Sequence, residues 1–493
     1  MESGLPLYRA EQVRELDRIA IEMAGIPGYT LMSRAGEVAF ETLRSTWPEA
    51  RRLAVVCGTG NNGGDGYVVG RLALEAGMDA IALQLGDSQR IRGDARTALE
   101  DFLSVGGTVS GFDQSVFRDV DVIVDAMLGT GLERPLEGEW REAVEALNRV
   151  VEPVLAVDIP TGLHADTGMV LGSAVMAACT VTFIGRKQGL FTGQAPLYTG
   201  PVYFSELQVP DSVYQQVPVE TRLLEHAPLG ALALPRPRTA HKGNHGHVLV
   251  IGGDHGMSGA VRLAGEAAAR VGAGLVSVAT RQDHAAIITA GCPELMCHGV
   301  EQISGLNPLL QRASVVVIGP GLGQSPWAND LLTTVLESDL PLVVDADALN
   351  MLASRPIDRG GWIITPHPGE AARLLGVSTA SIESNRYSAI DELVARYHST
   401  TVLKGAGTLI SAGGHIAVCR AGNPGMACGG MGDVLSGVIA GLVAQGLDLP
   451  QAAEAGVCIH AAAGDSAARD GERGLMPSDL LLKLRTEMNP DRR

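Results

Sequence analysis

One carboxylate stands where a glycine-rich stretch meets an apolar helical run near the end of the chain. Residues 422–442 read GNPGMACGGMGDVLSGVIAGL, and Asp433 is the single acid among them. Glycines let backbone N–H groups approach a ligand closely, and a helix start adds unpaired N–H donors, so this junction suits a phosphate. Because a phosphate repels a carboxylate, Asp433 is explained as a base that takes the proton of a hydroxyl reacting at phosphorus. A plain helix N-cap explains Asp433 equally well from this segment alone.

A second glycine-rich loop lies in the first half of the chain. Residues 58–63, GTGNNG, match G-x-G-x-x-G between a predicted strand and a predicted helix, which indicates a dinucleotide-binding oxidoreductase. The loop continues through Asp65 and is longer and more polar than a Rossmann turn. The acid expected about 20 residues later would be Asp79, which precedes its strand instead of ending it. The motif therefore does not establish a dehydrogenase.

Polar side chains also follow other predicted strands of this half. Asp125 ends the strand in VIVDAMLGTG, and Asp158 ends the strand in AVDIPTG, with Thr161 shortly after it. Because the carboxyl ends of parallel strands meet at one sheet edge, we expect these residues to converge there with Asn62. Such mixed oxygen ligands suit a hard cation, although acids at strand ends also serve as caps and turn formers.

Composition limits the class of protein. The 493 residues carry a net charge of −17, which argues against nucleic acid and anionic membranes as partners. Apolar residues make up 46% of the chain and aromatic residues only 4%, and glycine occurs 62 times, which fits parallel α/β sheets. No apolar run reaches the ~18 residues of a membrane helix, and no signal peptide is apparent. The seven scattered cysteines favour reduced thiols and a cytoplasmic location.

The order of predicted elements divides the chain into two α/β domains. Helices are expected at 9–24 and 29–45, and from about residue 65. Strands are expected at 51–57, 80–85, 121–125, 154–158 and 180–184, and in the second half at 247–251, 275–279, 315–318, 342–344, 362–365 and 402–403, followed by a hairpin at 408–419. Prolines recur between residues 209 and 241, as in a linker. We therefore predict domains at 1–215 and 241–493 joined by a linker at 216–240.

Further motifs of the second half could meet a nucleotide. Lys404 ends a strand before GAGT and is placed to meet phosphates. His367 and Glu370 lie in a proline-stiffened turn, PHPGE, where a ligand-facing histidine and a structural cap are both reasonable. Residues 241–247 contain three histidines, but no carboxylate or cysteine completes a zinc set there.

The first-half motifs carry a resemblance. GTGNNGGDG, VDAMLGTGL and AVDIPTGL resemble the Rossmann-like epimerase domain of the bifunctional NAD(P)H-hydrate repair enzymes. The resemblance implies a potassium ion held by Asn62, Asp125 and Thr161. It also implies contacts to the hydrated nicotinamide nucleotide from Asn61, Asn62, Gly63, Gly64, Asp65, Gly129, Thr130, Gly131, Leu132, Glu133, Arg134, Pro135 and Asp158.

The second half resembles the ribokinase-like, ADP-dependent NAD(P)H-hydrate dehydratases from about residue 241 to 484, through GPGLG, VVDADALN, ITPHPGEAARLLG, VLKGAGTLI and GGMGD. The resemblance implies contacts to the hydrate from Ala260, Gly323, His367 and Asp433. It implies that ADP lies along Lys404, Gly405, Ala406, Gly407, Thr408 and Gly432. One departure is Met431, where relatives usually carry a small or hydroxyl residue, so a side-chain hydroxyl contact would be lost while the backbone N–H remains.

Together the two resemblances imply a repair enzyme for hydrated NADH and NADPH. The first domain would epimerise the R and S forms, with Asp158 and Asp125 as acid–base candidates. The second would transfer the β-phosphoryl group of ADP to the hydroxyl of the S form, with Asp433 as base, and elimination would restore NAD(P)H and release AMP and phosphate. Magnesium is expected with the nucleotide, and we also expect a homo-oligomer. A ribokinase-like vitamin-precursor kinase, a non-catalytic nucleotide sensor and a dehydrogenase are the alternatives.

Overall fold

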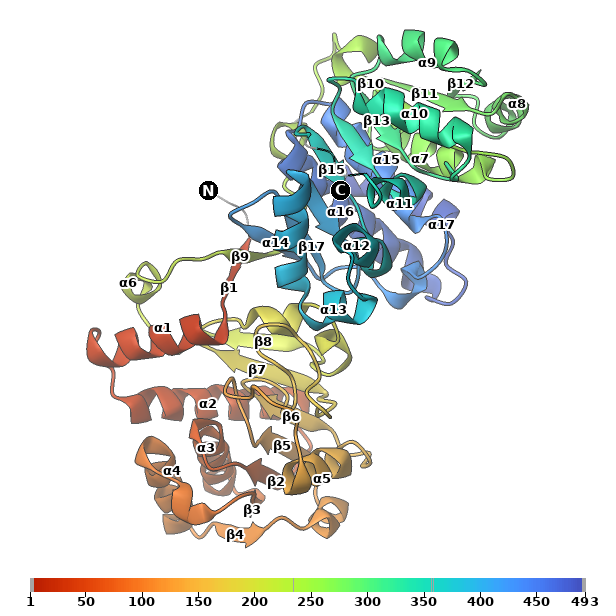
Figure 1. The fold of residues 1–493 in the computed structure, drawn as a ribbon. Helices are drawn as coiled ribbons and strands as arrows, with labels where there is room; N and C mark the ends of the chain where they lie inside the picture. Colours follow the sequence, from red (N-terminus) through yellow and green to blue (C-terminus); the bar gives the residue numbers. More distant parts are fainter. Residues whose placement is uncertain (1–3, 234, 356, 358, 490–493) are drawn as a thin grey trace. The chain divides into compact units, whose positions relative to one another are not determined.

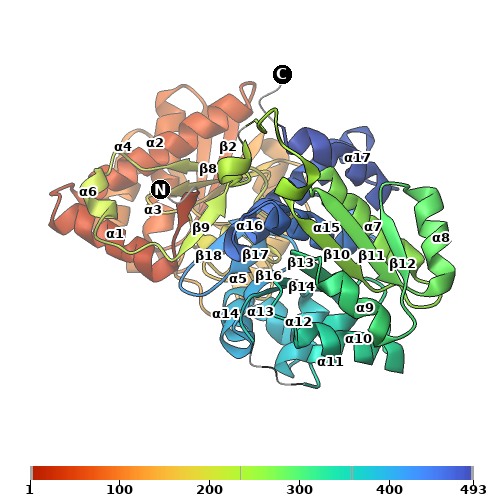
Figure 2. The ribbon, with the colours of Figure 1, turned by 90° about the horizontal axis from the view of Figure 1, so that it is seen from above.

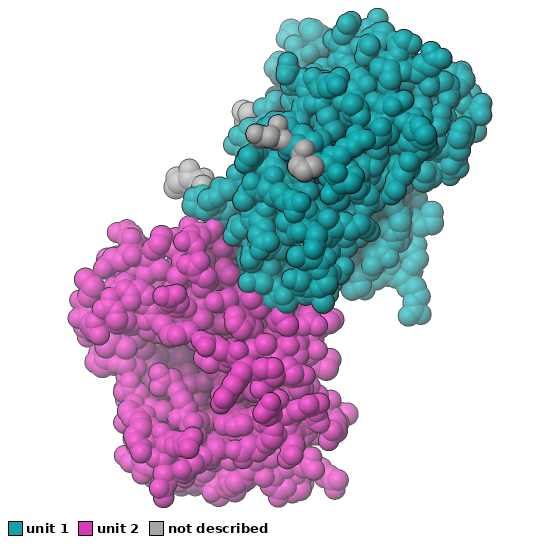
Figure 3. Space-filling view, viewed as in Figure 1, with its two compact units in different colours: residues 1–5, 222–493 teal, residues 6–221 magenta. Residues whose placement is uncertain are grey.

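The computed structural model describes residues 4–233, 235–355, 357 and 359–489. The chain forms two compact units, one of Pro6–Thr221 and one of Met1–Leu5 with Arg222–Arg493 (Figure 3). Both are α/β, as predicted, and each is described separately below. Among the described residues, no helix combines the length and apolarity needed to cross a bilayer.

The first unit is built on a seven-stranded, wholly parallel sheet in the order β4-β3-β2-β5-β6-β7-β8. The strands are β2 (Arg52–Cys57), β3 (Asp79–Gln84), β4 (Thr108–Gly111), β5 (Val122–Ala126), β6 (Val154–Val157), β7 (Cys179–Phe183) and β8 (Val202–Ser205). The helices are α1 (Ala10–Glu22), α2 (Gly28–Thr46), α3 (Asn61–Glu75), α4 (Gly93–Ser104), α5 (Gly138–Leu147) and α6 (Asp211–Tyr214). Strand order reverses between β2 and β5, where parallel sheets form their ligand crevice.

Successive side chains of each strand point to opposite faces of the sheet, so this unit has one core cluster on each face. Val55 of β2 packs in the cluster that holds buried residues of α1 to α4. Its neighbour Val56 packs in the cluster that holds Val144 and Leu147 of α5. Helices therefore cover both faces of the sheet, as Figure 1 shows, and they leave the carboxyl ends of the strands to the loops.

The second unit is built on an eleven-stranded sheet in the order β1-β9-β18-β17-β16-β15-β14-β13-β10-β11-β12. The run from β12 to β16 is parallel, whereas β16, β17 and β18 are antiparallel. The strands are β1 (Leu5–Leu7), β9 (Thr221–Leu224), β10 (His247–Ile251), β11 (Leu275–Thr280), β12 (Met296–Gly299), β13 (Val315–Ile318), β14 (Leu342–Val344), β15 (Trp362–Ile364), β16 (Thr400–Leu403), β17 (Thr408–Ser411) and β18 (Ile416–Cys419).

The helices of this unit cover the sheet in the arrangement that Figure 2 shows from above. They are α7 (Ser258–Arg270), α8 (Gln282–Gly291), α9 (Ile303–Leu310), α10 (Pro326–Leu336), α11 (Ala346–Leu352), α12 (Pro368–Leu375), α13 (Thr379–Ser384), α14 (Arg386–Tyr397), α15 (Met431–Ala444), α16 (Leu449–Ala467) and α17 (Pro477–Glu487). Residues of α7, α15, α16 and α17 share one core cluster with Val248, Val315 and Val343 of the sheet. The strand order reverses between β10 and β13, so a second ligand crevice is expected at that point.

The structure differs from the predicted elements in identifiable places. β1, β4, β8, β9 and β12 were not predicted, because each has only three or four residues and each includes partly buried or exposed positions. Helix α3 begins at Asn61 and not near Asp65, so the polar part of the glycine loop is the first helical turn. β9 lies inside the segment 216–240 that was predicted as a linker, and Arg222 of β9 forms an ion pair with Glu454 of α16 at 2.7 Å. Only part of that segment therefore connects the two units.

Candidate active sites

The residues predicted as cation ligands lie around the strand reversal of the first unit. The Asp125 carboxylate is fully buried and accepts hydrogen bonds from the backbone N–H and the hydroxyl of Thr161, both at 2.8 Å. The Met127 N–H donates to it at 3.2 Å. Burial raises the pKa of Asp125 to about 6, against the opposing effect of these hydrogen bonds, and no ion pair to it occurs among the described residues. The Asn62 amide is also buried, and neither its oxygen nor its nitrogen has a hydrogen-bond partner within the described part of the chain.

A cavity of about 470 Å³ opens at the same sheet edge. Predicted hydrate-binding residues that line it are Asn61, Asn62, Asp65, Gly129, Thr130, Gly131 and Asp158. The other predicted contacts, Gly63, Gly64, Leu132, Glu133, Arg134 and Pro135, do not line this cavity, and neither do Asp125 and Thr161.

Two glycines of the loop that follows β2 serve packing. A Cβ at Gly63 would collide with the Gly58 carbonyl, and a Cβ at Gly64 would press on the Met32 side chain at 2.7 Å. These glycines let the first turn of α3 lie directly against its surroundings. Gly60, by contrast, lines the cavity and has nothing within 4 Å of its Cβ position. Close approach of a ligand to the backbone is therefore possible at Gly60.

Four further charged residues that sequence reasoning missed line this cavity: Arg14 and Asp17 of α1, Asp94 of α4 and Lys187 after β7. The Lys187 ammonium is buried and forms an ion pair with the Asp158 carboxylate. Asp158 has a left-handed backbone (φ 68°), a strained conformation for a residue other than glycine. No sequence motif marks Asp17, which looks like an ordinary polar position of an amphipathic helix. The signal for Lys187 was available but weak, because it lies shortly after a predicted strand.

In the second unit, Asp433 is the third residue of α15, whose N-cap Gly430 has a left-handed backbone (φ 95°). Its neighbour Gly432 lies against an ion pair, because a Cβ there would be 3.3 Å from both Asp345 Oδ2 and Lys404 Nζ. Lys404 Nζ donates to Asp345 Oδ1 at 2.8 Å, and Ser436 Oγ donates to Asp345 Oδ2 at 2.8 Å. Asp345, which the sequence analysis did not select, therefore connects the strand end that carries Lys404 with the helix that carries Asp433.

These groups shift one another's ionisation. Burial, followed by the nearby Asp345 carboxylate, raises the pKa of Asp433 to about 7. Burial alone would lower the pKa of Lys404, but Asp345 and then Glu370 reverse this and raise it above its usual value. The Asp433 carboxyl is thus poised to gain or lose a proton near neutral pH, while Lys404 stays charged. Such a pair suits proton acceptance beside a bound phosphate.

His367 is the N-cap of α12 and forms a capping box with Glu370. Its Nδ1 accepts a hydrogen bond from the Gly369 N–H at 3.0 Å, and Glu370 Oε2 accepts one from the His367 N–H at 2.8 Å. Burial, together with the Lys404 and Arg373 cations, lowers the pKa of His367. The structural cap is therefore present, and Nε2 of the half-exposed side chain lies 3.5 Å from Glu370 Oε1.

The predicted hydrate contacts Ala260 and Gly323 lie at the strand reversal of the second unit. Ala260 is in the first turn of α7, and a Cβ at Gly321 would lie 3.1 Å from its own. The Gly323 N–H donates to Asp347 Oδ2 at 2.8 Å.

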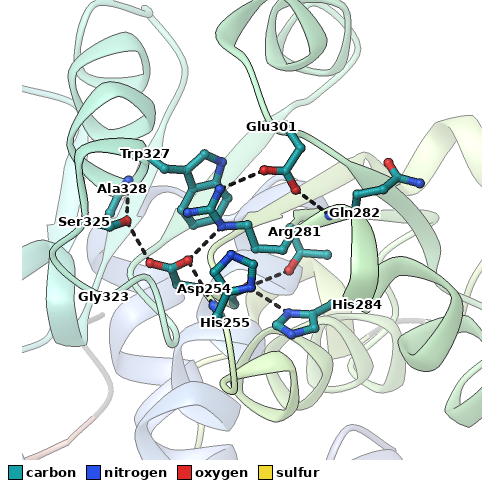
Figure 4. A network of polar contacts seen from close by, with 12 residues as sticks. Asp254, His255, Arg281, Gln282, His284, Glu301, Gly323, Ser325, Trp327 and Ala328 are labelled. Atoms are coloured by element: carbon teal, nitrogen blue, oxygen red, sulfur yellow. Dashed lines mark hydrogen bonds and ion pairs between the residues drawn. The ribbon is translucent and has the colours of Figure 1, made fainter.

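A polar network holds the loop that carries Gly323 (Figure 4). Asp254 accepts hydrogen bonds from Arg281 Nε at 2.8 Å and from Ser325 Oγ at 2.7 Å. The Arg281 guanidinium stacks over the Trp327 ring at 4.1 Å. Asp254 thus connects the loops after β10, β11 and β13, which fixes the backbone around Gly323.

The predicted ADP-contact residues form the connection between β16 and β17. Gly405 and Gly407 have left-handed backbones (φ 143° and 62°), and Thr408 Oγ1 donates to the Gly405 carbonyl at 2.9 Å. The buried Arg386 guanidinium donates to the Leu403 carbonyl at 3.0 Å and braces the strand end below this turn. Lys404 Nζ lies 3.3 Å from the Cβ position of Gly432, and a shared contact of these two residues with ADP stays a prediction. Among the described residues, no group of three or more His, Cys, Asp or Glu side chains is arranged to hold a metal, and the histidines at 241–247 form no such site.

Each half of the chain matches a known protein family. Residues 248–486 match the family model for NAD(P)H-hydrate dehydratase, and residues 28–189 match that for the YjeF-related protein N-terminus. A ribokinase-like superfamily protein of known structure from Enterococcus faecalis is 32% identical, with a TM-score of 0.51 over 54% of this chain and 95% of its own. An ADP/ATP-dependent NAD(P)H-hydrate dehydratase from Bacillus subtilis, co-crystallised with ATP and Mg²⁺, is 30% identical, with a TM-score of 0.47 over 52% of this chain and 95% of its own.

Relatives also match this chain over nearly its whole length. The bifunctional NAD(P)H-hydrate repair enzyme Nnr of Coxiella burnetii is 51% identical over 98% of this chain and 99% of its own length. The enzyme of the same name from Escherichia coli is 45% identical over 98% and 94%. The match at this identity runs through both active-site regions, so the kinase, sensor and dehydrogenase alternatives are not favoured. The chain belongs to the family of bifunctional NAD(P)H-hydrate repair enzymes.

Proposed function

We propose that the first unit interconverts the R and S forms of hydrated NADH and NADPH, and that the second unit dehydrates the S form at the expense of ADP, yielding AMP and phosphate. The observation that carries the proposal is the placement of Asp433 in the first turn of α15, with its raised pKa, beside the buried Lys404–Asp345 ion pair. A phosphate binder would gain nothing from that carboxylate, whereas phosphoryl transfer to a hydroxyl requires a base there.

In the dehydration, Asp433 accepts the proton of the C6 hydroxyl as its oxygen attacks the β-phosphorus of ADP and AMP leaves. Lys404 and the N–H groups at the start of α15 stabilise the negative charge of the phosphoryl oxygens. Loss of phosphate from C6 and of a proton from the neighbouring carbon then restores the dihydronicotinamide ring. Gly432 admits the phosphate because any larger residue there would press on the Lys404–Asp345 pair.

We expect magnesium to bind at this site only together with the phosphates of the nucleotide. The described residues offer no cluster of acidic side chains that would hold a divalent ion alone, and Mg²⁺ commonly binds through one or two carboxylates plus substrate phosphates. Glu370, whose Oε2 is 3.7 Å from Lys404 Nζ, is the carboxylate we assign to it. When bound, the ion would neutralise charge that develops on the phosphate oxygens.

Potassium fits the first unit. Within the described part of the chain, the buried Asp125 carboxylate has no ion pair and the buried Asn62 amide has no hydrogen-bond partner, and a cation would satisfy this charge and this oxygen. We propose that Asn62, Asp125 and Thr161 hold it. A single carboxylate with neutral oxygens suits a monovalent ion better than a divalent one, which recruits more anionic ligands.

We assign the roles of Asp158 and Asp125 by whether each residue lines the cavity. Asp158 lines it, so we keep Asp158 in the epimerisation site. Asp125 does not line it, and its oxygens accept hydrogen bonds from Thr161 and Met127, so we assign Asp125 to the cation alone. We further propose that the protein is a cytoplasmic homo-oligomer whose partners are small molecules.

The direct test supplies the purified chain with separated R and S forms of hydrated NADH. With ADP and Mg²⁺, absorbance of the dihydronicotinamide should return from the S form at once and from the R form after conversion. Phosphate and AMP should be released in equal amounts. Accumulation of a stable phosphorylated hydrate would instead support a kinase, and no reaction of either form would refute the proposal.

A further inference from the structure

Six ionisable side chains line the cavity of the first unit, and four of these, from four different elements, act on one another's charge. These four are Asp17 from α1, Asp65 from α3, Asp158 after β6 and Lys187 after β7. Three carboxylates therefore face one ammonium group. The inference drawn from them rests on the proposed epimerase function.

The Lys187 ammonium group is fixed in place by its hydrogen bonds. Besides its ion pair with Asp158, it donates to Thr182 Oγ1 and to the Phe183 carbonyl, both at 3.1 Å. Its three hydrogens are thus all engaged, and its side chain is only 2% exposed. The same Asp158 oxygen, Oδ1, also accepts a hydrogen bond from Thr182 Oγ1 at 3.5 Å.

Asp17 and Asp65 are in a different state. Neither carboxylate has a hydrogen bond or an ion pair within the described part of the chain. Burial, the Lys187 cation and the Asp158 anion act on Asp17 in that order of size, and its pKa rises to about 6. Burial, followed by Asp158 and Asp17, raises the pKa of Asp65 well above its usual value. Arg14 and Asp94 also line the cavity.

Asp158 thus pairs with the ammonium, whereas Asp65 and Asp17 combine raised pKa values with the lack of a partner among the described residues. In many enzymes the acid and the base are two neighbouring carboxyl groups whose surroundings give them different pKa values. We propose that Asp65 and Asp17 are the acid and the base of the epimerisation, and that Lys187 is a positioning residue for Asp158.

The chemistry balances with water as the only co-reactant. Asp65 gives its proton to the C6 hydroxyl, the C6–O bond breaks with its electron pair on oxygen, and water leaves. The lone pair of the ring nitrogen forms a C=N bond, and the resulting cation is stabilised by the ionised Asp17 and Asp158 carboxylates. Water then adds to C6 from the opposite face and gives a proton to Asp17. The hydroxyl is inverted, and a proton passes back from Asp17 to Asp65 before the next turnover.

The experiment uses the full chain and the R form of hydrated NADPH without ADP, so that only epimerisation proceeds. Asp17→Asn and Asp65→Asn should each lower the rate of S-form appearance by roughly 10²–10⁴-fold, the usual contribution of an acid–base group. The matched control is Asp94→Asn, another acid of the same cavity, which should retain the wild-type rate. Dehydration of the S form with ADP should be unchanged in all three, and thermal unfolding should show that the first unit stays folded.

Two readouts separate catalysis from structure. In H₂¹⁸O, the wild type should incorporate one ¹⁸O into the C6 hydroxyl per inversion, above the enzyme-free rate. In Lys187→Met, the loss of the cation should move the acidic limb of the rate profile to higher pH, because Lys187 lowers the pKa of Asp17 and of Asp65. A purely structural role would lower the rate without moving that limb.

An active wild type with undiminished Asp17→Asn and Asp65→Asn variants would overturn the inference, as would inversion without ¹⁸O uptake. A wild type that converts no R form would instead refute the epimerase function itself.

Discussion

At the scale of single residues, the strongest prediction concerns the role of Asp433 in dehydration. Gly430 and not Asp433 is the N-cap of α15, so Asp433→Asn keeps the size of the side chain, removes the base and leaves the cap unchanged. Dehydration of the S form should therefore fall by roughly 10²–10⁴-fold, while ADP still binds. Single-turnover rates and ADP titration would measure the two effects, with epimerisation in the same molecule as the internal control. Near-normal turnover would remove Asp433 from the mechanism.

The raised pKa of Asp433 also predicts how rate and stability depend on pH. The folded carboxyl has a pKa of about 7 against an ordinary value of 3.8, so the folded state binds its proton more tightly than the unfolded state. Between about pH 4 and 7 this group therefore lowers the free energy of unfolding as pH rises, and above 7 the effect is constant. The dehydration rate should rise over the same range, because the base must be ionised.

Denaturant unfolding of the wild type and of Asp433→Asn at pH 4 and at pH 8 checks the stability effect. The variant should be more stable than the wild type at pH 8, and the difference should shrink at pH 4. The opposite order would mean that Asp433 is stabilised as a carboxylate, with a lowered pKa.

At the scale of elements, the loop after β5 sets the shape of the epimerase cavity. A Cβ at Gly129 would lie 3.2 Å from Asp158 Oδ2 and 3.6 Å from the Asn62 Cβ, so Gly129→Ala should displace the carboxylate by a few tenths of an ångström. Epimerisation should slow by roughly ten- to a hundredfold, since small misplacements of reacting groups are costly. Gly111→Ala, where nothing lies within 4 Å of the Cβ position, is the control that should leave the rate unchanged.

The potassium site depends on the meeting of three elements, α3, β5 and the loop after β6. Asp125→Ala should impair epimerisation and leave ADP-dependent dehydration of the S form intact. A crystal grown in potassium should show a peak among the oxygens of Asn62, Asp125 and Thr161, with bonds longer than the ~2.1 Å of magnesium. Water alone at that place, with an epimerase indifferent to Asp125→Ala, would reduce these residues to turn formers.

At the scale of the whole molecule, the two units should work apart if the chain is cut at the right residue. Gln12 Nε2 donates to the Pro218 carbonyl at 2.9 Å within the first unit, while Arg222 of β9 pairs with Glu454 in the second. A cut between residues 220 and 221 should give one soluble piece with epimerase activity only and one with dehydratase activity only. A cut after residue 227 removes β9 from the second piece and should lower its thermal midpoint. If neither piece folds in either case, the two-domain interpretation fails.

The sequence by itself predicted the parallel α/β class, the two halves and most buried strands. Strands such as β10 and β13 are covered on both faces, and this burial requires a continuous apolar run that is visible in one dimension. It also selected Asp125, Asp158 and Lys404, which lie at or just after the carboxyl ends of strands and whose roles stay predictions. In a parallel sheet the carboxyl ends of the strands lie at one edge, so chain order alone brings such residues together.

Only the tertiary structure showed which neighbours complete the sites. Asp17 comes from a helix far from the glycine loop, and no local pattern separates it from a solvated polar residue. Asp345 forms an ion pair with a residue 59 positions away, and the Asn62 amide is buried without a hydrogen-bond partner among the described residues. Charge imbalance and desolvation are properties of a packed volume and not of spacing along the chain. For that reason the ionisation of Asp433, Asp65 and Asp17 was decided by the fold.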